Sequence, residues 1–132
     1  MIHSSRVSLL LVEDDKELAE ILAHRAKLEG FRVYYAHDGV EGLTLALREK
    51  PDAIVTDIML PEADGLSMVA ELRKHPWGKH VPVIVLTNYN DLRYIAQAIS
   101  CNVYEFVVKA QCEPHQIVAK VKQAIAERNC PD

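Results

Sequence analysis

Five polar residues stand at the ends of apolar runs in this sequence of 132 residues. They are the acids Glu13, Asp14 and Asp57, the hydroxyl residue Thr87 and the amine Lys109. If the carboxylates lie close together, each pair about 4 Å apart costs about 4 kcal/mol at an effective dielectric constant of 20. A divalent cation removes that cost, and a site made of oxygen atoms with open positions suits Mg²⁺, which also accepts phosphate. These residue types therefore indicate magnesium-assisted phosphoryl chemistry.

Each of these side chains would have a different role in such a site. A lysine supplies a compact positive charge for a phosphoryl oxygen, and a threonine hydroxyl can donate a hydrogen bond to a second oxygen. One carboxylate is then left as the nucleophile, which is a known role of aspartate in aspartyl-phosphate formation. Asp57 is the candidate, because it ends a buried strand and a loop containing Pro61 and Gly65 follows at once.

The elements that would position these residues alternate along the chain. Strands are expected at residues 7–12, 31–36, 53–57, 81–87 and 103–108. Helices are expected at residues 16–29, 38–49, 65–75 and 91–100 and from 114 onward. Strands that alternate with helices of this length predict βαβ units, a parallel sheet and helices on both of its faces. The carboxyl ends of such strands share one edge, so the polar residues should converge there.

Local signals refine some elements. Asp38 and Glu41 have the spacing of a capping box at a helix start, and Gly30 is placed to end the preceding helix in a left-handed conformation. Tyr34 and Tyr35 are interpreted simply as strand residues. The helix at 16–29 should bury the face that carries the following residues: Leu18, Ile21, Leu22, Arg25 and Leu28.

Composition limits the function classes. The length fits a single domain, with a core from about residue 7 to residue 127. The net charge of −4 and the scattered lysines and arginines argue against nucleic acid as a direct partner. No apolar stretch approaches the roughly 20 residues that span a bilayer, and the polar residues at the start of the sequence lead us to expect no signal peptide. Cys101, Cys112 and Cys130 are odd in number and lack a CxxC spacing, which predicts reduced thiols and a cytoplasmic location.

The combination resembles the receiver domain of two-component response regulators from Val7 to about Ala126. The resemblance is carried by Glu13-Asp14, by Asp57 in Asp-Ile-Met-Leu-Pro with Asp64-Gly65 following, by Thr87 and by Lys109. It implies a doubly wound five-stranded α/β fold, flavodoxin-like (CheY-like), with strand order 2-1-3-4-5.

The resemblance also implies roles. Asp57 would accept a phosphoryl group from a sensor histidine kinase, a histidine phosphotransfer protein or a small phosphodonor. Asp14 and Asp57 would bind Mg²⁺ directly with the Met59 backbone carbonyl, and Glu13 would act through water. The phosphoryl oxygens would be held by Thr87 and Lys109.

The implied output is a change of shape rather than an enzymatic product. Phe106 would be the switch aromatic that responds to Thr87, and the surface formed by residues 91–100, 103–108 and the last helix would change. That surface would contact a downstream protein or output domain, or a second copy in a homodimer. No enzyme activity is expected beyond the chain's own phosphoryl transfer and slow dephosphorylation.

Two positions depart from the family pattern, and two more lie where the family tunes its chemistry. Lys109 is normally followed by proline, but Ala110 follows here, so we expect a trans bond and an altered loop over residues 110–113. Asn88 replaces the usual small residue after Thr87 and could restrict small donors. Met59 and Tyr89 lie where the family tunes attack by water, and neither is acidic, which predicts slow self-dephosphorylation.

Other interpretations remain open at this stage. Taken singly, the acids could cap helices or turns, Thr87 could be an ordinary strand-end hydroxyl, and Lys109 could be solvated. A pseudo-receiver that binds partners without phosphorylation is the alternative function. An aspartyl-phosphate hydrolase of another family would need a second acid where Met59 stands. No output segment follows the last helix, so the chain is either a stand-alone receiver or part of a longer protein, and its cognate kinase stays open.

Overall fold

The computed structural model describes residues 7–88 and 92–128. Its strands are β1 (Ser8–Val12), β2 (Arg32–Ala36), β3 (Ala53–Asp57), β4 (Val83–Thr87) and β5 (Glu105–Val108). Its helices are α1 (Lys16–Leu28), α2 (Gly39–Glu49), α3 (Gly65–Leu72), α4 (Leu92–Ser100) and α5 (Pro114–Arg128). Two 3-10 turns, η1 (Trp77–Lys79) and η2 (Lys109–Gln111), complete the described elements. Within these residues no helix is long and apolar enough to cross a membrane.

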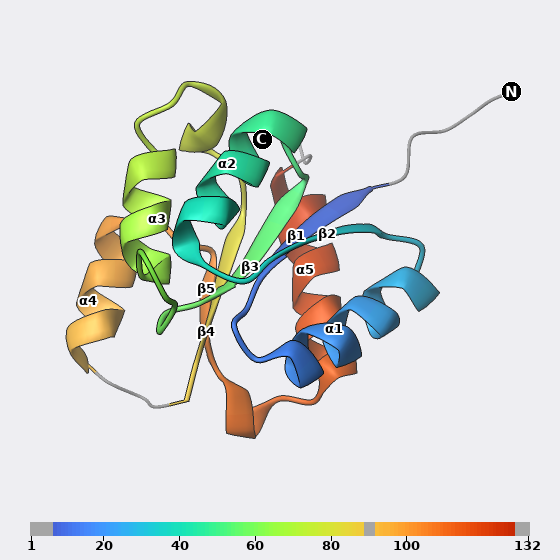
Figure 1. The fold of residues 1–132 in the computed structure, drawn as a ribbon. Coiled ribbons are helices and arrows are strands. Elements are labelled where there is room, and N and C mark those ends of the chain that lie inside the picture. The colour runs from blue at the N-terminus through green and yellow to red at the C-terminus, as the bar shows by residue number, and fades with distance from the viewer. Residues whose placement is uncertain (1–6, 89–91, 129–132) are drawn as a thin grey trace, which may run out of the picture.

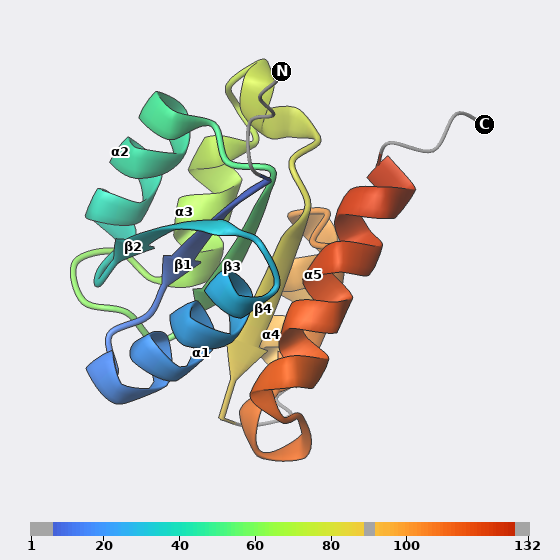
Figure 2. The ribbon, with the colours of Figure 1, turned by 90° about the vertical axis from the view of Figure 1, so that its right-hand side faces the viewer.

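All five strands pair in parallel in one sheet of order β2-β1-β3-β4-β5, as expected. Helices α2, α3 and α4 pack on one face, and α1 and α5 pack on the other (Figures 1 and 2). The three central strands are apolar along nearly their whole length, because both of their faces are covered. The doubly wound α/β fold is therefore confirmed.

Helix α1 buries a different face from the one that periodicity favoured. Its buried residues are Ala19, Leu22 and Ala26, whereas Ile21 is 47% exposed and Leu28 is 66% exposed. The small alanine side chains allow this face to approach the sheet closely. Ile21, Arg25 and Leu28 consequently face outward, so the predicted face was wrong at those three positions, whereas Leu22 is buried as expected.

Three predicted elements, α3, β4 and β5, are shorter than expected by two or three residues, each for a local reason. Helix α3 ends at Leu72 rather than at residue 75, since Pro76 disfavours helix in the residue before it. The chain then folds back so tightly that a Cβ at Gly78 would lie 2.1 Å from the Leu72 carbonyl oxygen. Strand β4 begins after Pro82, which has no N–H to donate.

The α4–β5 turn delays the start of β5 to Glu105. Asn102 adopts a left-handed conformation (φ 56°), and the Val103 N–H still bonds to the Ala98 carbonyl at the end of α4. Arg73 ties this turn to α3 by donating hydrogen bonds to four backbone carbonyls. These acceptors are Cys101, Asn102, Gly78 and Val81, at 2.7–3.0 Å. The turn and the end of α3 are thus held together by one guanidinium.

The peptide bonds of the described residues are all trans, including Lys109–Ala110, as predicted. The segment after Lys109 forms the short η2 turn, in which the Cys112 N–H donates to the Lys109 carbonyl at 3.4 Å. Half of the predicted capping box is present, because Asp38 Oδ1 accepts the Glu41 N–H at 2.7 Å. The Glu41 carboxylate accepts the N–H of His37 at 3.0 Å, one residue before the cap residue Asp38. Gly30 has the expected left-handed φ of 97°.

Candidate functional site

The register of the sheet brings the polar strand ends to one edge. Val12 pairs with Thr56, so Glu13 and Asp57 are the next residues on neighbouring strands. On the other side Thr87 pairs with Val108, so Lys109 directly follows the last pair of β4 and β5. Four of the strands, β1, β3, β4 and β5, thus deliver acids, a hydroxyl and an amine to the same edge, as the alternation of strands and helices predicts.

Lys109 lies between two buried carboxylates. Its Nζ is 2.8 Å from Asp57 Oδ2 and 3.0 Å from Glu13 Oε1. The lysine side chain is only 15% exposed, and both acids are almost fully buried. Burial alone would lower the pKa of Lys109, but its contacts with Asp57 and Glu13 outweigh that effect and raise the pKa above 10.5. Lys109 is therefore not a solvated surface residue, and it stays charged at neutral pH.

Asp57 is held by backbone as well as by Lys109. Its Oδ1 accepts the N–H of Ile58 at 2.7 Å, while Oδ2 faces the ammonium group. The following loop passes very close to the strand end, because a Cβ at Gly65 would lie 1.9 Å from the Asp57 carbonyl oxygen. Glycine at this position, with Asp64 capping α3 beside it, is what allows the loop to leave Asp57 at the edge of the sheet.

Glu13 is buried, and the negative charge of its carboxylate is only partly compensated. Its Oε2 accepts the Asp15 N–H at 3.0 Å, but its Oε1 has no hydrogen-bond partner and is balanced only by the ion pair with Lys109. Burial, together with the nearby charge of Asp57, raises the pKa of Glu13 above its ordinary value of 4.5. Two buried carboxylates share one lysine, so the edge of the sheet carries an excess negative charge.

The three consecutive acids have separate positions. Asp15 is the N-cap of α1, and its Oδ1 accepts the N–H groups of Glu17 and Leu18 at 3.1 and 3.2 Å. Asp14 is exposed, and Glu13 points inward to Lys109. Helix capping therefore accounts for Asp15 alone.

The residues at this edge fit a magnesium ion by their chemistry. The carboxylate oxygens are suitable ligands, the buried Glu13 Oε1 has only the Lys109 ammonium beside it, and the local charge is negative. Glu13, Asp14 and Asp57 would hold the ion. Met59, whose backbone carbonyl is the fourth predicted ligand, has a side chain that is 63% exposed.

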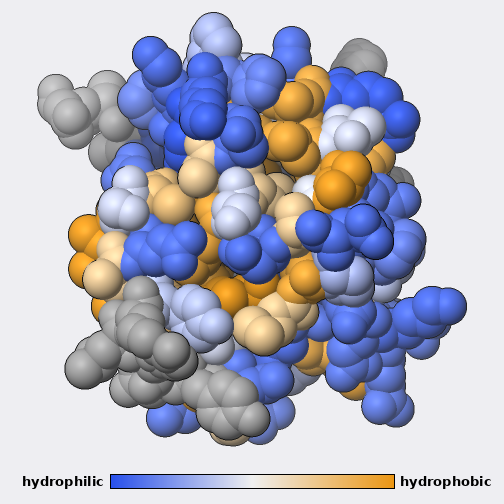
Figure 3. Space-filling model, turned by 60° about the vertical axis from the view of Figure 1, so that its left-hand side comes forward, coloured by the Kyte–Doolittle hydropathy of each residue, from blue (hydrophilic) through white to orange (hydrophobic). Residues whose placement is uncertain are grey.

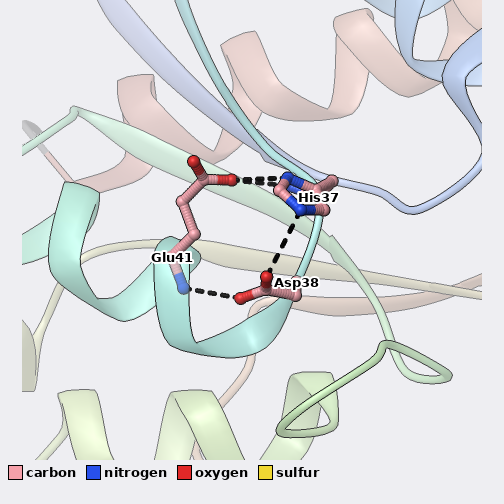
Figure 4. A group of neighbouring side chains, drawn as sticks. All are labelled: His37, Asp38 and Glu41. Carbon is pink, nitrogen blue, oxygen red and sulfur yellow. Dashed lines mark hydrogen bonds and ion pairs between the residues drawn. The ribbon is translucent and has the colours of Figure 1, made fainter.

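A second acidic group lies outside this edge. Among the described residues, the group of potential metal ligands whose atoms all lie within 4.8 Å is His37, Asp38 and Glu41 (Figure 4). His37 Nδ1 is 2.8 Å from Glu41 Oε1, and His37 Nε2 is 3.5 Å from Asp38 Oδ2. The two carboxylates face opposite ring nitrogens and also accept backbone N–H groups at the start of α2. This group therefore caps the start of α2, and the His37 ring contacts both of the capping carboxylates.

The predicted switch residues lie on β4 and β5. Thr87 is buried at the end of β4, and Phe106 pairs with Val85 and packs partly buried against the core on the α2–α4 side. Phe106 also lines a cavity of about 400 Å³ with Ile95, Gln111 and Cys112. Asn88 is exposed, and Tyr89 lies outside the described residues.

The predicted output surface includes apolar side chains. Figure 3 shows the side of the molecule on which α4 lies, where apolar side chains emerge between polar ones. Ile99 of α4 is 73% exposed, and Lys120 of α5 forms an ion pair with Glu105 of β5 at 2.5 Å. This surface therefore offers both apolar contacts and charges to a partner.

Sequence reasoning missed Tyr35 as a residue of the site. Its hydroxyl donates a 2.8 Å hydrogen bond to the backbone carbonyl of Glu13. The signal that could have revealed it is the strand order. Once β2 is paired with β1, Tyr35 lies beside Leu11, two residues before Glu13.

Comparison with known proteins identifies relatives along nearly the whole chain. Residues 9–122 match the response regulator receiver domain. Response regulator MprA of Mycobacterium leprae (strain TN) is 31% identical over 124 residues, which are 94% of this chain and 53% of that protein. Transcriptional regulatory protein GlrR of Escherichia coli (strain K12) is 38% identical over 101 residues, which are 76% of this chain and 22% of GlrR. The chain spans about a third (34%) of the length of MprA from Mycobacterium bovis.

Solved structures agree with this result. The receiver domain of a signal transduction histidine kinase from Syntrophus aciditrophicus has a TM-score of 0.84 and 27% identity, covering 95% of this chain and 94% of that one. The receiver domain of sensor histidine kinase PA1611 from Pseudomonas aeruginosa PAO1, solved with magnesium in its active-site cleft, has a TM-score of 0.83 and 25% identity, covering 92% and 99%. With the match over residues 9–122, these likenesses show that the chain belongs to the response regulator receiver domain family of two-component systems.

Proposed function

We propose that this chain is a phosphorylation-dependent switch in which Asp57 is the phosphoacceptor. The observation that carries the proposal is the buried lysine between Glu13 and Asp57, at 3.0 and 2.8 Å. A cation enclosed beside a nucleophilic carboxylate is suited to a transferring phosphoryl group, because it can neutralise charge without reorganising. A merely structural aspartate at a strand end would not need that partner.

In the proposed reaction a carboxylate oxygen of Asp57 attacks the phosphorus of a phosphohistidine on a kinase or phosphotransfer protein. An oxygen–phosphorus bond forms and the phosphorus–nitrogen bond breaks, and the departing imidazole nitrogen keeps the electron pair and takes a proton. Lys109 and the Thr87 hydroxyl would hold two phosphoryl oxygens. The chain would then act only on itself, as a phosphoacceptor rather than as an enzyme for a separate substrate.

Glu13, Asp14, Asp57 and the Met59 carbonyl would hold Mg²⁺. When bound, the ion supplies positive charge that offsets the charge of the phosphoryl oxygens. The carboxylates of this chain would keep the ion at the sheet edge, and the loop after Asp57 stays close to the strand through Gly65. The two buried carboxylates of Glu13 and Asp57, which share the single positive charge of Lys109, support this part of the proposal.

Phosphorylation would change the contacts of Lys109 and Thr87. A phosphoryl group adds about 1.5 to 2 negative charges, so Lys109 would exchange its carboxylate partner for a phosphoryl oxygen. Thr87 would turn toward the same group, and Phe106 would follow inward from its partly buried position. The surface of α4, β5 and α5 would then favour a downstream protein, an output domain or a second copy of the chain.

The test is incubation with acetyl phosphate and Mg²⁺ followed by intact-mass measurement. The wild-type protein should gain one phosphoryl group, and the gain should vanish in Asp57→Asn and with EDTA. Asp38→Asn is the matched control, since asparagine also caps helices well and this position lies outside the site. It should be phosphorylated like the wild type.

The alternative is a pseudo-receiver that binds partners without phosphorylation. Asn88, which is exposed and directly follows Thr87, favours this alternative, because a side chain of this size would restrict the access of small phosphodonors to Asp57. No mass gain, combined with no change in amide NMR shifts on adding beryllium fluoride and Mg²⁺, would contradict the switch and support the pseudo-receiver. Beryllium fluoride tests the site without a chemical step.

A further inference from the structure

Tyr35 contacts the loop that carries the acidic pair. Its hydroxyl donates a hydrogen bond of 2.8 Å to the backbone carbonyl of Glu13. The Glu13 N–H in turn donates to the carbonyl of Ala36 at 3.0 Å, at the last pair of β1 and β2, which is Val12 with Ala36. Both the N–H and the carbonyl of Glu13 are therefore held by β2.

The Glu13 carbonyl belongs to the peptide unit that joins Glu13 to Asp14. Because a peptide unit is planar, a hydrogen bond to its oxygen also restrains the orientation of the N–H and Cα of Asp14. The Glu13 side chain has its own contacts with Asp15 and Lys109, whereas the Asp14 side chain is exposed. The direction in which Asp14 leaves the backbone thus depends on the peptide that Tyr35 holds.

The geometry identifies the donor and the acceptor of this contact. The phenol of Tyr35 has one O–H to donate, and the Glu13 carbonyl oxygen, which can only accept, lies 2.8 Å from it.

We propose that Tyr35 is a positioning residue for the acidic pair: its hydroxyl holds the Glu13–Asp14 peptide so that Asp14 is presented to a divalent cation beside Asp57. The inference rests on the proposed function, because it concerns the Mg²⁺ that this site would hold. Tyr35 would touch neither the ion nor the phosphoryl group. Loss of one neutral hydrogen bond predicts roughly threefold to tenfold weaker Mg²⁺ binding.

The experiment is a titration with Mg²⁺ alone, followed by the backbone amide NMR shifts of the wild type and Tyr35→Phe. Tyr34→Phe is the matched control, because it removes the same hydroxyl from the adjacent residue, whose ring packs against the core on the α2–α4 side. We expect about threefold to tenfold weaker binding for Tyr35→Phe and less than about twofold change for Tyr34→Phe. The amide spectra also report whether each variant is folded.

A double-mutant cycle separates positioning from general loosening. If Tyr35 acts through Asp14, its effect on Mg²⁺ affinity should fall below about twofold in an Asp14→Asn background. An undiminished effect in that background would overturn the inference, and so would wild-type affinity in Tyr35→Phe. Absence of Mg²⁺ binding in the wild type would instead overturn the magnesium part of the proposed function and this inference with it.

Discussion

Replacing Lys109 by methionine tests the electrostatics of the site directly. Methionine keeps the length of the side chain but removes the charge that lies 2.8 Å from Asp57 and 3.0 Å from Glu13. Removing one partner of a buried ion pair costs about 3–5 kcal/mol, because an uncompensated charge remains. Lys109 is 15% exposed and Glu13 can take up a proton, so we expect the lower end, about 3 kcal/mol, at pH 7.

The loss should depend on pH in a defined direction. Burial raises the pKa of Glu13 above 4.5, so the folded protein binds this proton more tightly than the unfolded chain. The stabilisation that comes from this tighter proton binding is fully present below the pKa of Glu13 in the unfolded chain. It is lost as the pH rises through the higher pKa of Glu13 in the folded protein. Without Lys109 the folded pKa rises further. The variant should therefore lose about 1 kcal/mol less at pH 5 than at pH 7, since one pKa unit corresponds to about 1.4 kcal/mol.

The assay is urea unfolding of the metal-free protein at both pH values. Lys120→Met is the matched control, because it breaks the more exposed ion pair with Glu105 and should cost less than about 1 kcal/mol. The reasoning would be refuted if Lys109→Met cost no more than Lys120→Met at pH 7. It would also be refuted if the loss were larger at pH 5 than at pH 7.

Three further outcomes are expected. Asp57→Asn should raise the free energy of unfolding of the metal-free protein by about 1 kcal/mol at pH 7, since two carboxylates no longer share one lysine; a urea midpoint below that of the wild type would contradict this. Arg73→Met should lower it by about 3 kcal/mol or more in the same assay, because four carbonyl acceptors lose their donor; a loss under about 1 kcal/mol would count against it. The phosphoryl group on Asp57 should persist for minutes or longer by intact mass without a phosphatase, because neither Met59 nor Tyr89 is acidic; a half-life of seconds would refute it.

The convergence of the site was predictable because it follows from the topology. Alternating strands and helices require a parallel sheet, and the carboxyl ends of its strands share one edge. Glu13 and Asp57 are therefore neighbours once the strand order is known, and Lys109 lies on the same edge, two strands away from Asp57. The direct insertion of Lys109 between the two acids was not predictable, since it depends on the short η2 turn and on which side chains are buried.

The buried face of α1 shows where periodicity fails. Ile21 and Leu28 are more hydrophobic than Ala19 and Ala26, so a pattern of large apolar residues favours the wrong side. The structure buries the alanines because small side chains bring the helix closer to the sheet. The distance between a helix and the sheet depends on how the layers pack together, so it cannot be predicted from the hydrophobic pattern of one helix.

Tyr35 illustrates a different limit. A tyrosine in a strand is most simply a packing residue, and only the pairing of β1 with β2 brings its hydroxyl to the Glu13 carbonyl. The contact joins a side chain to a backbone atom 22 residues earlier, so no local spacing of residues in the sequence predicts it. Contacts of this kind can be identified only from the three-dimensional structure.

The central claim is that Asp57 itself becomes phosphorylated, and its most direct test is to locate the modification. The protein would be treated with acetyl phosphate and Mg²⁺, reduced with borohydride, which converts an acyl phosphate to an alcohol, and digested for peptide mass mapping. The account predicts conversion at Asp57 and at no other acid, with none in Asp57→Asn. Conversion at Glu13 or Asp14 in place of Asp57, or equal conversion in Asp57→Asn, would contradict it.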